Sequence, residues 1–229
     1  MKRLRYFTVS LALILPGVIT GAADSEWQEL FDGKSLDGWS VHSGSAEYRV
    51  EDGVIVGKTA EGSPNSFLCT DREYGDFILE FEVQVDPRLN SGVQFRSQIA
   101  DSEKVFWFRD GKGRISKHTI PQDRVYGYQA EIAESSAGKI YDEARRGFFL
   151  GEDTVSEEAE NAFKSKEWNQ YRIMCKGDSI KVWINEVLVT DLRDGLDSSG
   201  VIGLQVHSVP KNSPTMEVRW RNLRIQELE

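Results

Sequence analysis

Pairs of hydrogen-bonding side chains, spaced two residues apart, recur in separate segments of the chain. The pairs are Gln94 with Arg96, Gln129 with Glu131, and Gln205 with His207. Because side chains two positions apart on a strand point to the same side, each pair would occupy one face of its strand. A glutamate and a histidine on one surface can act as base and acid, and an arginine can stabilise an oxyanion. We therefore expect a binding surface with catalytic potential where these strands lie side by side.

The segment GKIYDEARRGFFL, Gly138 to Leu150, concentrates charge between aromatic residues and glycines. Asp142 and Glu143 stand beside Arg145 and Arg146. Two interpretations fit this pattern: a salt-bridge network that stabilises a loop, or the rim of a binding site. Each polar residue singled out so far has an ordinary structural explanation when taken alone. Their coincidence in four segments favours a binding face.

Strand signals follow one another at short intervals along the chain. In DFILEFEVQVD the apolar side chains from Phe77 to Val85 alternate with polar ones, as one buried sheet face requires. Residues 47–58 are typical of a hairpin about Glu51-Asp52-Gly53. The other strand candidates are residues 168–192, as three strands with turns at 176–178 and 185–186, and residues 201–208 and 215–228.

Many short strands, few helices and one core predict an all-β protein. The fold that we expect is a β-sandwich of two antiparallel sheets. An eight-stranded barrel is the alternative, and a total of about twelve strands favours two stacked sheets.

Two segments depart from the strand pattern. Residues 155–168, VSEEAENAFKSKEW, favour a short surface helix that the Ser156 hydroxyl can cap. Residues 99–124 form a long connection, and long connections within compact folds tend to be lids or binding loops. The aromatic side chains of Phe106, Trp107 and Phe108 would allow this loop to cover a ligand.

The composition restricts the partners of the protein. With 39% hydrophobic residues among 229, the chain can bury a sizeable core. The formal net charge of -9 argues against nucleic acid and anionic membrane surfaces as partners, because both need clustered positive charge. A neutral small-molecule ligand fits this balance.

Residues 1–23 have the order of a secretory signal peptide. Basic residues precede an apolar run from about residue 7 to residue 19, and small residues end the segment. The run is shorter than the roughly 20 residues of a membrane span, although a retained N-terminal anchor is an alternative. We expect residues 24–229 to form a single domain that is exported to the periplasm or the extracellular space.

The two cysteines and three histidines indicate neither a disulfide framework nor a metal site. Cys69 and Cys175 could pair in an exported protein, or each could be a small buried residue. His42, His118 and His207 show no metal-ligand spacing, so a zinc site is not supported.

Segments spread over about residues 27–228 resemble the 3-keto-disaccharide hydrolase domain family, and the YDEARRG-containing members are the most similar subset. These segments are FDGKSLDGW (31–39), NSGVQFRS (90–97), RVYGYQAEI (124–132), GKIYDEARRGFF (138–149), EWNQYRI (167–173), GLQVHS (203–208) and VRWRNLRI (218–225). The resemblance implies a concanavalin A-like jelly-roll β-sandwich, with long loops over the concave face of one sheet. It also implies hydrolysis of sugars oxidised at carbon 3.

The chain departs from many family members at particular positions. Those members have a glutamate in place of Gln129 and a glutamine in place of Glu131, whereas this chain has QAEI. Many relatives also have a histidine where this chain has Tyr126, and a Trp-rich pair in place of Gly147-Phe148. These differences bear on the substrate rather than on the fold.

For a 3-keto sugar, the resemblance implies a particular chemistry. The ketone acidifies the hydrogen on carbon 2, so a base can remove that hydrogen and the enolate can expel the oxygen on carbon 1. In this interpretation Glu131 is the base, His207 is the proton donor, and Arg96 with Arg146 holds the enolate oxygen. Further side chains would bind the sugar, with Tyr141 stacking on its ring: Gln94, Gln129, Tyr141, Asp142, Arg145, Gln205 and Trp107.

Other interpretations stay open at the level of sequence. A divalent cation, Ca²⁺ or Mg²⁺, could replace an arginine as the electrophile, with carboxylate ligands from Glu131, Glu134 and Asp142. The competing function is a non-catalytic carbohydrate-binding (lectin-like) module, which needs aromatic platforms and hydrogen bonds but no acid and base. An adhesion or scaffold domain is a third possibility.

Overall fold

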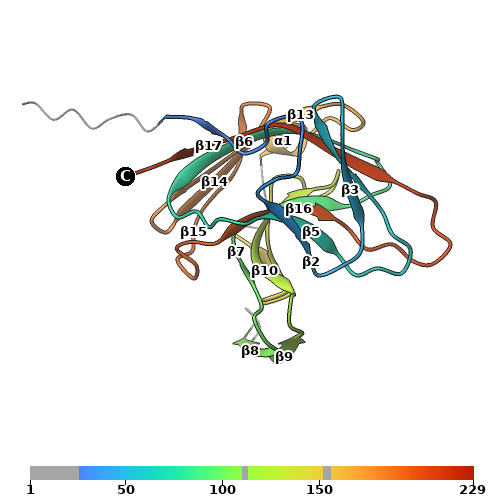
Figure 1. The fold of residues 1–229 in the computed structure, drawn as a ribbon. Helices are drawn as coiled ribbons and strands as arrows, with labels where there is room; N and C mark the ends of the chain where they lie inside the picture. The colour runs from blue at the N-terminus through green and yellow to red at the C-terminus, as the bar shows by residue number, and fades with distance from the viewer. Residues whose placement is uncertain (1–25, 110–112, 152–155) are drawn as a thin grey trace, which may run out of the picture.

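The computed structural model describes residues 26–109, 113–151 and 156–229, and the expected signal peptide lies outside the described residues. Two antiparallel sheets pack face to face (Figure 1). We call them the back sheet and the site sheet. Each sheet ends in two strands that have a partner on one side only, so the described residues form an open sandwich and not a barrel.

The back sheet has eight strands. Their order is β15 (Val187–Arg193), β14 (Ser179–Ile184), β13 (Asn169–Lys176), β6 (Phe77–Val85), β17 (Glu217–Glu227), β4 (Val54–Lys58) and β3 (Glu47–Glu51), with β1 (Gln28–Glu29) also paired to β17.

The site sheet has seven strands. Their order is β12 (Phe149–Leu150), β11 (Ile140–Glu143), β10 (Val125–Ile132), β7 (Ser91–Ile99), β16 (Val201–Val206), β5 (Ser66–Thr70) and β2 (Trp39–His42).

The alternation of apolar residues places the core between the two sheets. On the back sheet Phe81 of β6 stacks on Tyr171 of β13, with ring centroids 5.2 Å apart. On the site sheet Phe95 of β7 stacks on Tyr128 of β10 at 5.6 Å. All four side chains belong to one buried cluster, as the period of two predicts. The alternation therefore directs Gln129 and Glu131 of β10 to the outer face of the site sheet.

The predicted hairpin turns are confirmed. Asp52 and Gly53 between β3 and β4 both have positive φ, as do Asn185 and Glu186 between β14 and β15. Two consecutive residues of positive φ are the signature of a type I′ turn, whose twist matches that of the paired strands.

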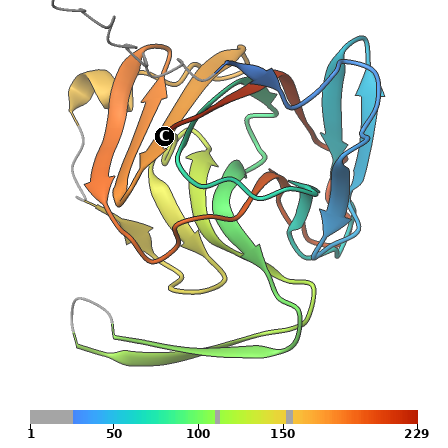
Figure 2. The same cartoon turned by 60° about the vertical axis from the view of Figure 1, so that its left-hand side comes forward.

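The connection from Ile99 to Arg124 is not the loop that the sequence analysis expects. It is a two-stranded ribbon of β8 (Lys104–Arg109) and β9 (Ile115–Ile120), which pair only with each other. The ribbon projects beyond the site sheet (Figure 2). Phe106 anchors its base, because the ring packs against Tyr126 of β10 with centroids 5.2 Å apart.

The short helix is confirmed as α1 (Glu157–Glu160). The Ser156 hydroxyl accepts a hydrogen bond from the Ala159 amide at 3.1 Å, as an N-cap does. None of the described helices has the length and apolar character that a membrane crossing requires.

The two cysteines do not pair. Cys175 of β13 lies in the core between the sheets, whereas Cys69 of β5 lies in a separate cluster with Phe67, Val125 and Val201. Both thiols are free and buried. Of the two sequence interpretations, the small buried residue is therefore the correct one.

Candidate functional site

A pocket of about 310 Å³ opens on the outer face of the site sheet. Strands β10, β11, β12 and β16 and the residues next to β5, β7 and β16 contribute its lining. The lining residues are Asn65, Asn90, Gln129, Glu131, Tyr141, Glu143, Phe149, Gln205 and His207. The structure thus brings together five of the residues that the sequence singles out, namely Gln129, Glu131, Tyr141, Gln205 and His207.

Strand register explains how distant segments meet in this pocket. Gln129 of β10 stands opposite Tyr141 of β11 on one side and opposite Gln94 of β7 on the other. Gly92 gives Gln129 the room it needs, because a Cβ on Gly92 would lie 2.6 Å from the Gln129 side chain. Only glycine fits at this position while Gln129 keeps its place.

Glu131 is the buried carboxyl group of the pocket. Its oxygens accept hydrogen bonds from Gln129 Nε2 at 2.5 Å and from Asn90 Nδ2 at 3.1 Å. Burial raises the pKa of Glu131, and these two donors only partly offset the effect by stabilising the anion. The nearby Glu143 raises the pKa further. A carboxylate whose pKa is raised in this way is a stronger base than an exposed glutamate.

Gln94 lies behind the pocket rather than in its lining. Its Nε2 donates to Gln129 Oε1 at 2.7 Å, and its own oxygen accepts from Ser97 Oγ at 2.6 Å. This chain of hydrogen bonds fixes the orientation of the Gln129 amide, so that the Gln129 NH₂ group points at Glu131. Gln94 therefore positions the site and does not line it.

The tautomer of His207 follows from its hydrogen bond. Nδ1 lies 2.9 Å from the carbonyl oxygen of Ser208, which can only accept, so Nδ1 carries a proton. In the neutral ring Nε2 is then an acceptor, and in the protonated ring it is a donor. The side chain is part-buried and lines the pocket.

Gln205 has a side-chain amide with no partner. It is fully buried, and among the described residues neither its oxygen nor its nitrogen has a hydrogen-bond partner. An unsatisfied buried amide costs free energy, on the order of 1–3 kcal/mol. Gln205 also lines the pocket, so its unsatisfied amide borders the space that a ligand would occupy.

Arg96 is not in the site, and the prediction that it shares a face with Gln94 is wrong. Arg96 has a φ of 46°, and the register of β7 with β10 shifts beside it. This bulge reverses the alternation, and the fully buried guanidinium crosses toward the back sheet. There it donates to the carbonyl oxygens of Gly75 and Gly177 at 2.7 Å and to Asp76 at 2.5 Å.

Asp142 and the two arginines that follow it also lie outside the pocket. Asp142 alternates with Tyr141 and Glu143 on β11, so its side chain lies on the opposite face. It forms ion pairs with Arg145 at 3.1 Å and with Arg146. The arginines pair in turn with Asp197 at 2.7 Å and Asp194 at 2.6 Å, respectively. The loop-stabilising interpretation is therefore the correct one for these three residues.

Trp107 does not reach the pocket. Its side chain is 65% exposed, and its ring lies 5.9 Å from the Lys117 ammonium group on the outer side of the ribbon. Trp107 alternates with Phe106 and Phe108, which lie on the other face of β8. Its expected place in the sugar site is wrong for this reason.

Four pocket residues were missed by the sequence analysis as site candidates: Asn65, Asn90, Glu143 and Phe149. Glu143 accepts hydrogen bonds from Asn65 Nδ2 at 3.2 Å and from Arg124. Because Glu143 lies two residues after Tyr141, both side chains point to the same side of the strand, and this spacing could have identified Glu143. Asn90 opens the NSG segment next to β7. Asn65 and Phe149 carry no comparable signal, because Asn65 precedes β5 and Phe149 begins the two-residue strand β12.

The carboxylates proposed to bind a divalent cation do not meet. Asp142 faces away from the pocket, and Glu134 lines a different pocket beside α1. In the part of the chain that the structure describes, no group of three His, Cys, Asp or Glu side chains could hold a metal ion. The proposed ligand set is therefore wrong.

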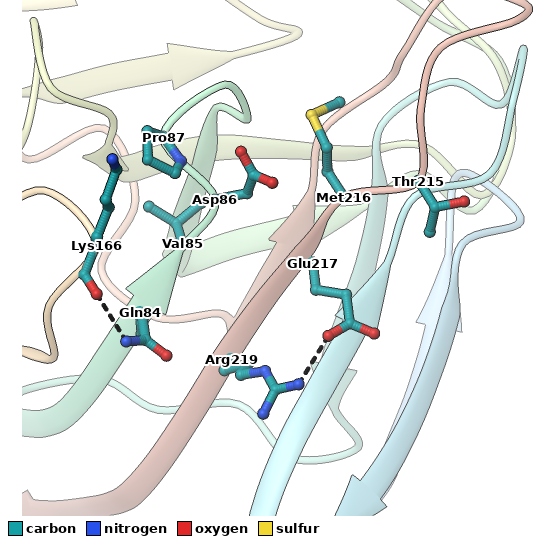
Figure 3. A pocket seen from close by; sticks show the side chains of 9 residues that line it. All are labelled: Gln84, Val85, Asp86, Pro87, Lys166, Thr215, Met216, Glu217 and Arg219. Atoms are coloured by element: carbon teal, nitrogen blue, oxygen red, sulfur yellow. Dashed lines mark hydrogen bonds and ion pairs between the residues drawn. The ribbon is translucent and has the colours of Figure 1, made fainter.

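Two other pockets lie on the back sheet. One, of about 480 Å³, lies beside the end of β6 and the start of β17 (Figure 3). Its polar groups satisfy one another, with Gln84 donating to the Lys166 carbonyl at 2.8 Å and Arg219 pairing with Glu217 at 2.9 Å. The other, of about 750 Å³, contains Glu80, which is already paired with Arg172 and Arg224. Neither combines a raised carboxyl pKa with an unpartnered buried amide.

The family assignment comes from the whole sequence. Residues 26–226 match the sequence model of the 3-keto-alpha-glucoside-1,2-lyase-like domain. The chain belongs to this family. A comparison of the chain with curated proteins gave no match.

Several solved structures have the same fold as this chain. A candidate glycosyl hydrolase from Parabacteroides distasonis has a TM-score of 0.55 at 17% identity, over 89% of this chain and 94% of that one. The carbohydrate-binding module CBM66 from Bacillus subtilis has a TM-score of 0.54 at 18% identity, over 82% and 95%. A Bacillus subtilis protein with a galectin-like fold has a TM-score of 0.57 at 10% identity, over 88% and 98%. The jelly-roll sandwich predicted from the sequence is confirmed.

Proposed function

We propose that the protein is an exported enzyme that cleaves 3-keto-disaccharides or 3-keto-glucosides by elimination across carbons 1 and 2, followed by hydration. One observation carries this proposal: Glu131, His207 and the unpartnered amide of Gln205 face a single pocket. The family membership supports a glycoside as the substrate.

In the first step, the Glu131 carboxylate removes the proton on carbon 2, which the neighbouring ketone acidifies. The electron pair then forms the double bond between carbons 1 and 2, and the bond from carbon 1 to the leaving oxygen breaks. The His207 imidazolium gives its Nε2 proton to that oxygen. This step needs one base and one acid, and not the paired carboxylates of ordinary glycosidases.

In the second step, water adds across the double bond. The oxygen of water bonds to carbon 1, and neutral His207 takes one proton of that water. Glu131 returns its proton to carbon 2. Both side chains thereby recover their starting protonation states, and the net reaction is hydrolysis.

Gln205 replaces the arginines as the group that stabilises the enolate. Its Nε2 is a buried donor with no other partner among the described residues, so it can donate to the keto oxygen as negative charge develops there. Asn90 and Gln129 hold the Glu131 carboxylate, and Glu143 can accept hydrogen bonds from sugar hydroxyl groups.

Turnover of a 3-keto-disaccharide by Glu131→Gln tests the proposal. The variant keeps the shape of the side chain but loses the base, so we expect kcat to fall at least about a hundredfold. Glu134→Gln is the matched control, because Glu134 lies outside this pocket. Release of monosaccharide by Glu131→Gln at the wild-type rate would remove Glu131 from this role.

The second candidate is a non-catalytic carbohydrate-binding module. Its support is an aromatic surface at the pocket, where Phe149 is 45% exposed and lies edge to face with Tyr141 at 5.3 Å. This function predicts retention of a 3-keto-disaccharide without release of monosaccharide. It also predicts that neither the wild type nor Glu131→Gln turns over the sugar.

A further inference from the structure

A strip of aromatic rings extends from the pocket onto the β8–β9 ribbon. We call Phe149, Tyr141, His118 and Phe108 the aromatic strip. Phe149 and Tyr141 line the pocket. Phe108 and His118 lie on the ribbon, with ring centroids 6.3 Å apart. The strip therefore runs from the pocket on the site sheet to the β8–β9 ribbon, which is not paired with that sheet.

Gly147 is the junction of the strip. A Cβ on Gly147 would lie 2.9 Å from Cε1 of His118 and 3.8 Å from the Tyr141 hydroxyl. The His118 ring is thus in contact with the loop that follows β11, beside the wall of the pocket. Gly147 also has a φ of +69°, so both its conformation and the close approach favour glycine.

The two faces of the ribbon differ. Phe106, Phe108 and His118 share the face that packs toward the sandwich, and all three side chains are part-buried. Val105 and Trp107 lie on the other face and are 46% and 65% exposed. Phe106 supplies the anchor to Tyr126. Among the described residues, the Phe108 ring contacts only the rings of Phe106 and His118. The contact between Phe106 and Tyr126 therefore does not explain why Phe108 lies on this face.

The size of the pocket indicates what the strip contacts. At about 310 Å³ the pocket is at the small end of the range of about 300–1,000 Å³ for ligand sites. Such a volume has room for one sugar ring with its carbon 2 at Glu131, and the group on carbon 1 would then lie toward the mouth of the pocket. The aromatic strip borders the pocket on the side of Tyr141, so a group that leaves the pocket on this side would contact its rings.

We propose that the aromatic strip is the subsite for the leaving group, and that it favours an aromatic aglycone over a small aliphatic one. The inference rests on the proposed function, because it places the scissile bond at the mouth of the pocket. Flat rings gain from offset or edge-to-face contact with Phe108, and the His118 imidazole can hydrogen-bond to a substituent of the aglycone.

The test compares 4-nitrophenyl and methyl 3-keto-glucosides in wild type, Phe108→Ala, Phe108→Leu and His118→Ala. We expect the KM and Kd of the aryl glycoside to rise about tenfold in Phe108→Ala, with the values for the methyl glycoside unchanged within about twofold. Phe108→Leu keeps apolar bulk and should lie between Phe108→Ala and the wild type. Trp107→Ala, on the outer face of the same strand, should leave both glycosides unaffected.

The outcomes separate this inference from the proposed function. If the wild type binds both glycosides but turns over neither, the proposed enzyme fails, and the ratio of the two Kd values still decides the subsite. Equal effects of Phe108→Ala on the aryl and methyl glycosides overturn the subsite. So does an effect of Trp107→Ala on the aryl glycoside as large as that of Phe108→Ala.

Discussion

At the scale of the residue, the chemistry of the pocket depends on the surroundings of Glu131. Burial disfavours its charged form, whereas donors from Gln129 and Asn90 favour it, and burial prevails. Its pKa therefore lies above the ordinary value of 4.5. A base must be ionised to act, so the acid limb of the pH–rate profile reports this pKa.

Asn90→Ala should move that acid limb to higher pH. The substitution removes one donor that stabilises the Glu131 carboxylate, so the anion becomes less favourable and the pKa of Glu131 rises further. The measurement is the pH dependence of kcat/KM on a 3-keto-glucoside. Asn65→Ala is the control, because Asn65 donates to Glu143 and not to Glu131. An acid limb that stays in place, or that moves to lower pH, contradicts the assignment of Glu131 as the base.

At the scale of the element, one bulge in β7 decides which residues face the pocket. Arg96 adopts positive φ and leaves the outer face, and Ser97 then reaches Gln94. The Arg96 guanidinium instead connects the site sheet to the turn between β13 and β14. It holds the two sheets together at one end of the sandwich, away from the pocket.

Arg96→Ala should destabilise the fold without changing the affinity of the site. Its loss removes the ion pair with Asp76 and the donor to two backbone carbonyls, although Asp76 still accepts from the Gly177 amide, so we expect the free energy of unfolding to fall by about 3 kcal/mol. Denaturant unfolding measures this value. Arg88→Ala is the control, since the Arg88 side chain is 62% exposed and pairs only with Asp86, and it should cost less than about 1 kcal/mol. An Arg96→Ala protein of wild-type stability that has lost sugar binding would return Arg96 to the site.

At the scale of the whole molecule, the sandwich presents its pocket and its ribbon on the same side. Strand β10 supplies Glu131, and β16 with the residue that follows it supplies Gln205 and His207. The net charge of -9 suits a neutral sugar and not a polyanion. Export, which we propose from residues 1–23, would bring the enzyme to glycosides outside the cytoplasm.

Expression of the full chain in a bacterium that secretes proteins tests export. We expect the mature protein to begin near Ala23 or Asp24, because small residues there follow the apolar run. N-terminal sequencing and intact mass of the recovered protein measure this. An intact Met1 on protein that stays with the membrane fraction would favour the retained anchor instead.

The alternation of residues along the chain was enough to predict much of the fold and part of the site. It placed Gln129 with Glu131 and Gln205 with His207 on outward faces, because a strand repeats every two residues. The hairpin turns also followed from local chemistry at Asp52-Gly53. The ribbon was missed, although KVFWFR and RISKHTI flank an Asp-Gly pair of the kind that joins hairpin strands.

By itself, the sequence determined the sandwich and the outward direction of Glu131 and His207, since both depend on local periodicity. Only the tertiary structure decided that Arg96 turns away, that Asp142 and its two arginines brace a loop, and that Gln205 has a free amide. Those outcomes depend on a single backbone dihedral angle and on partners far apart in the chain. Local patterns carry no information about either.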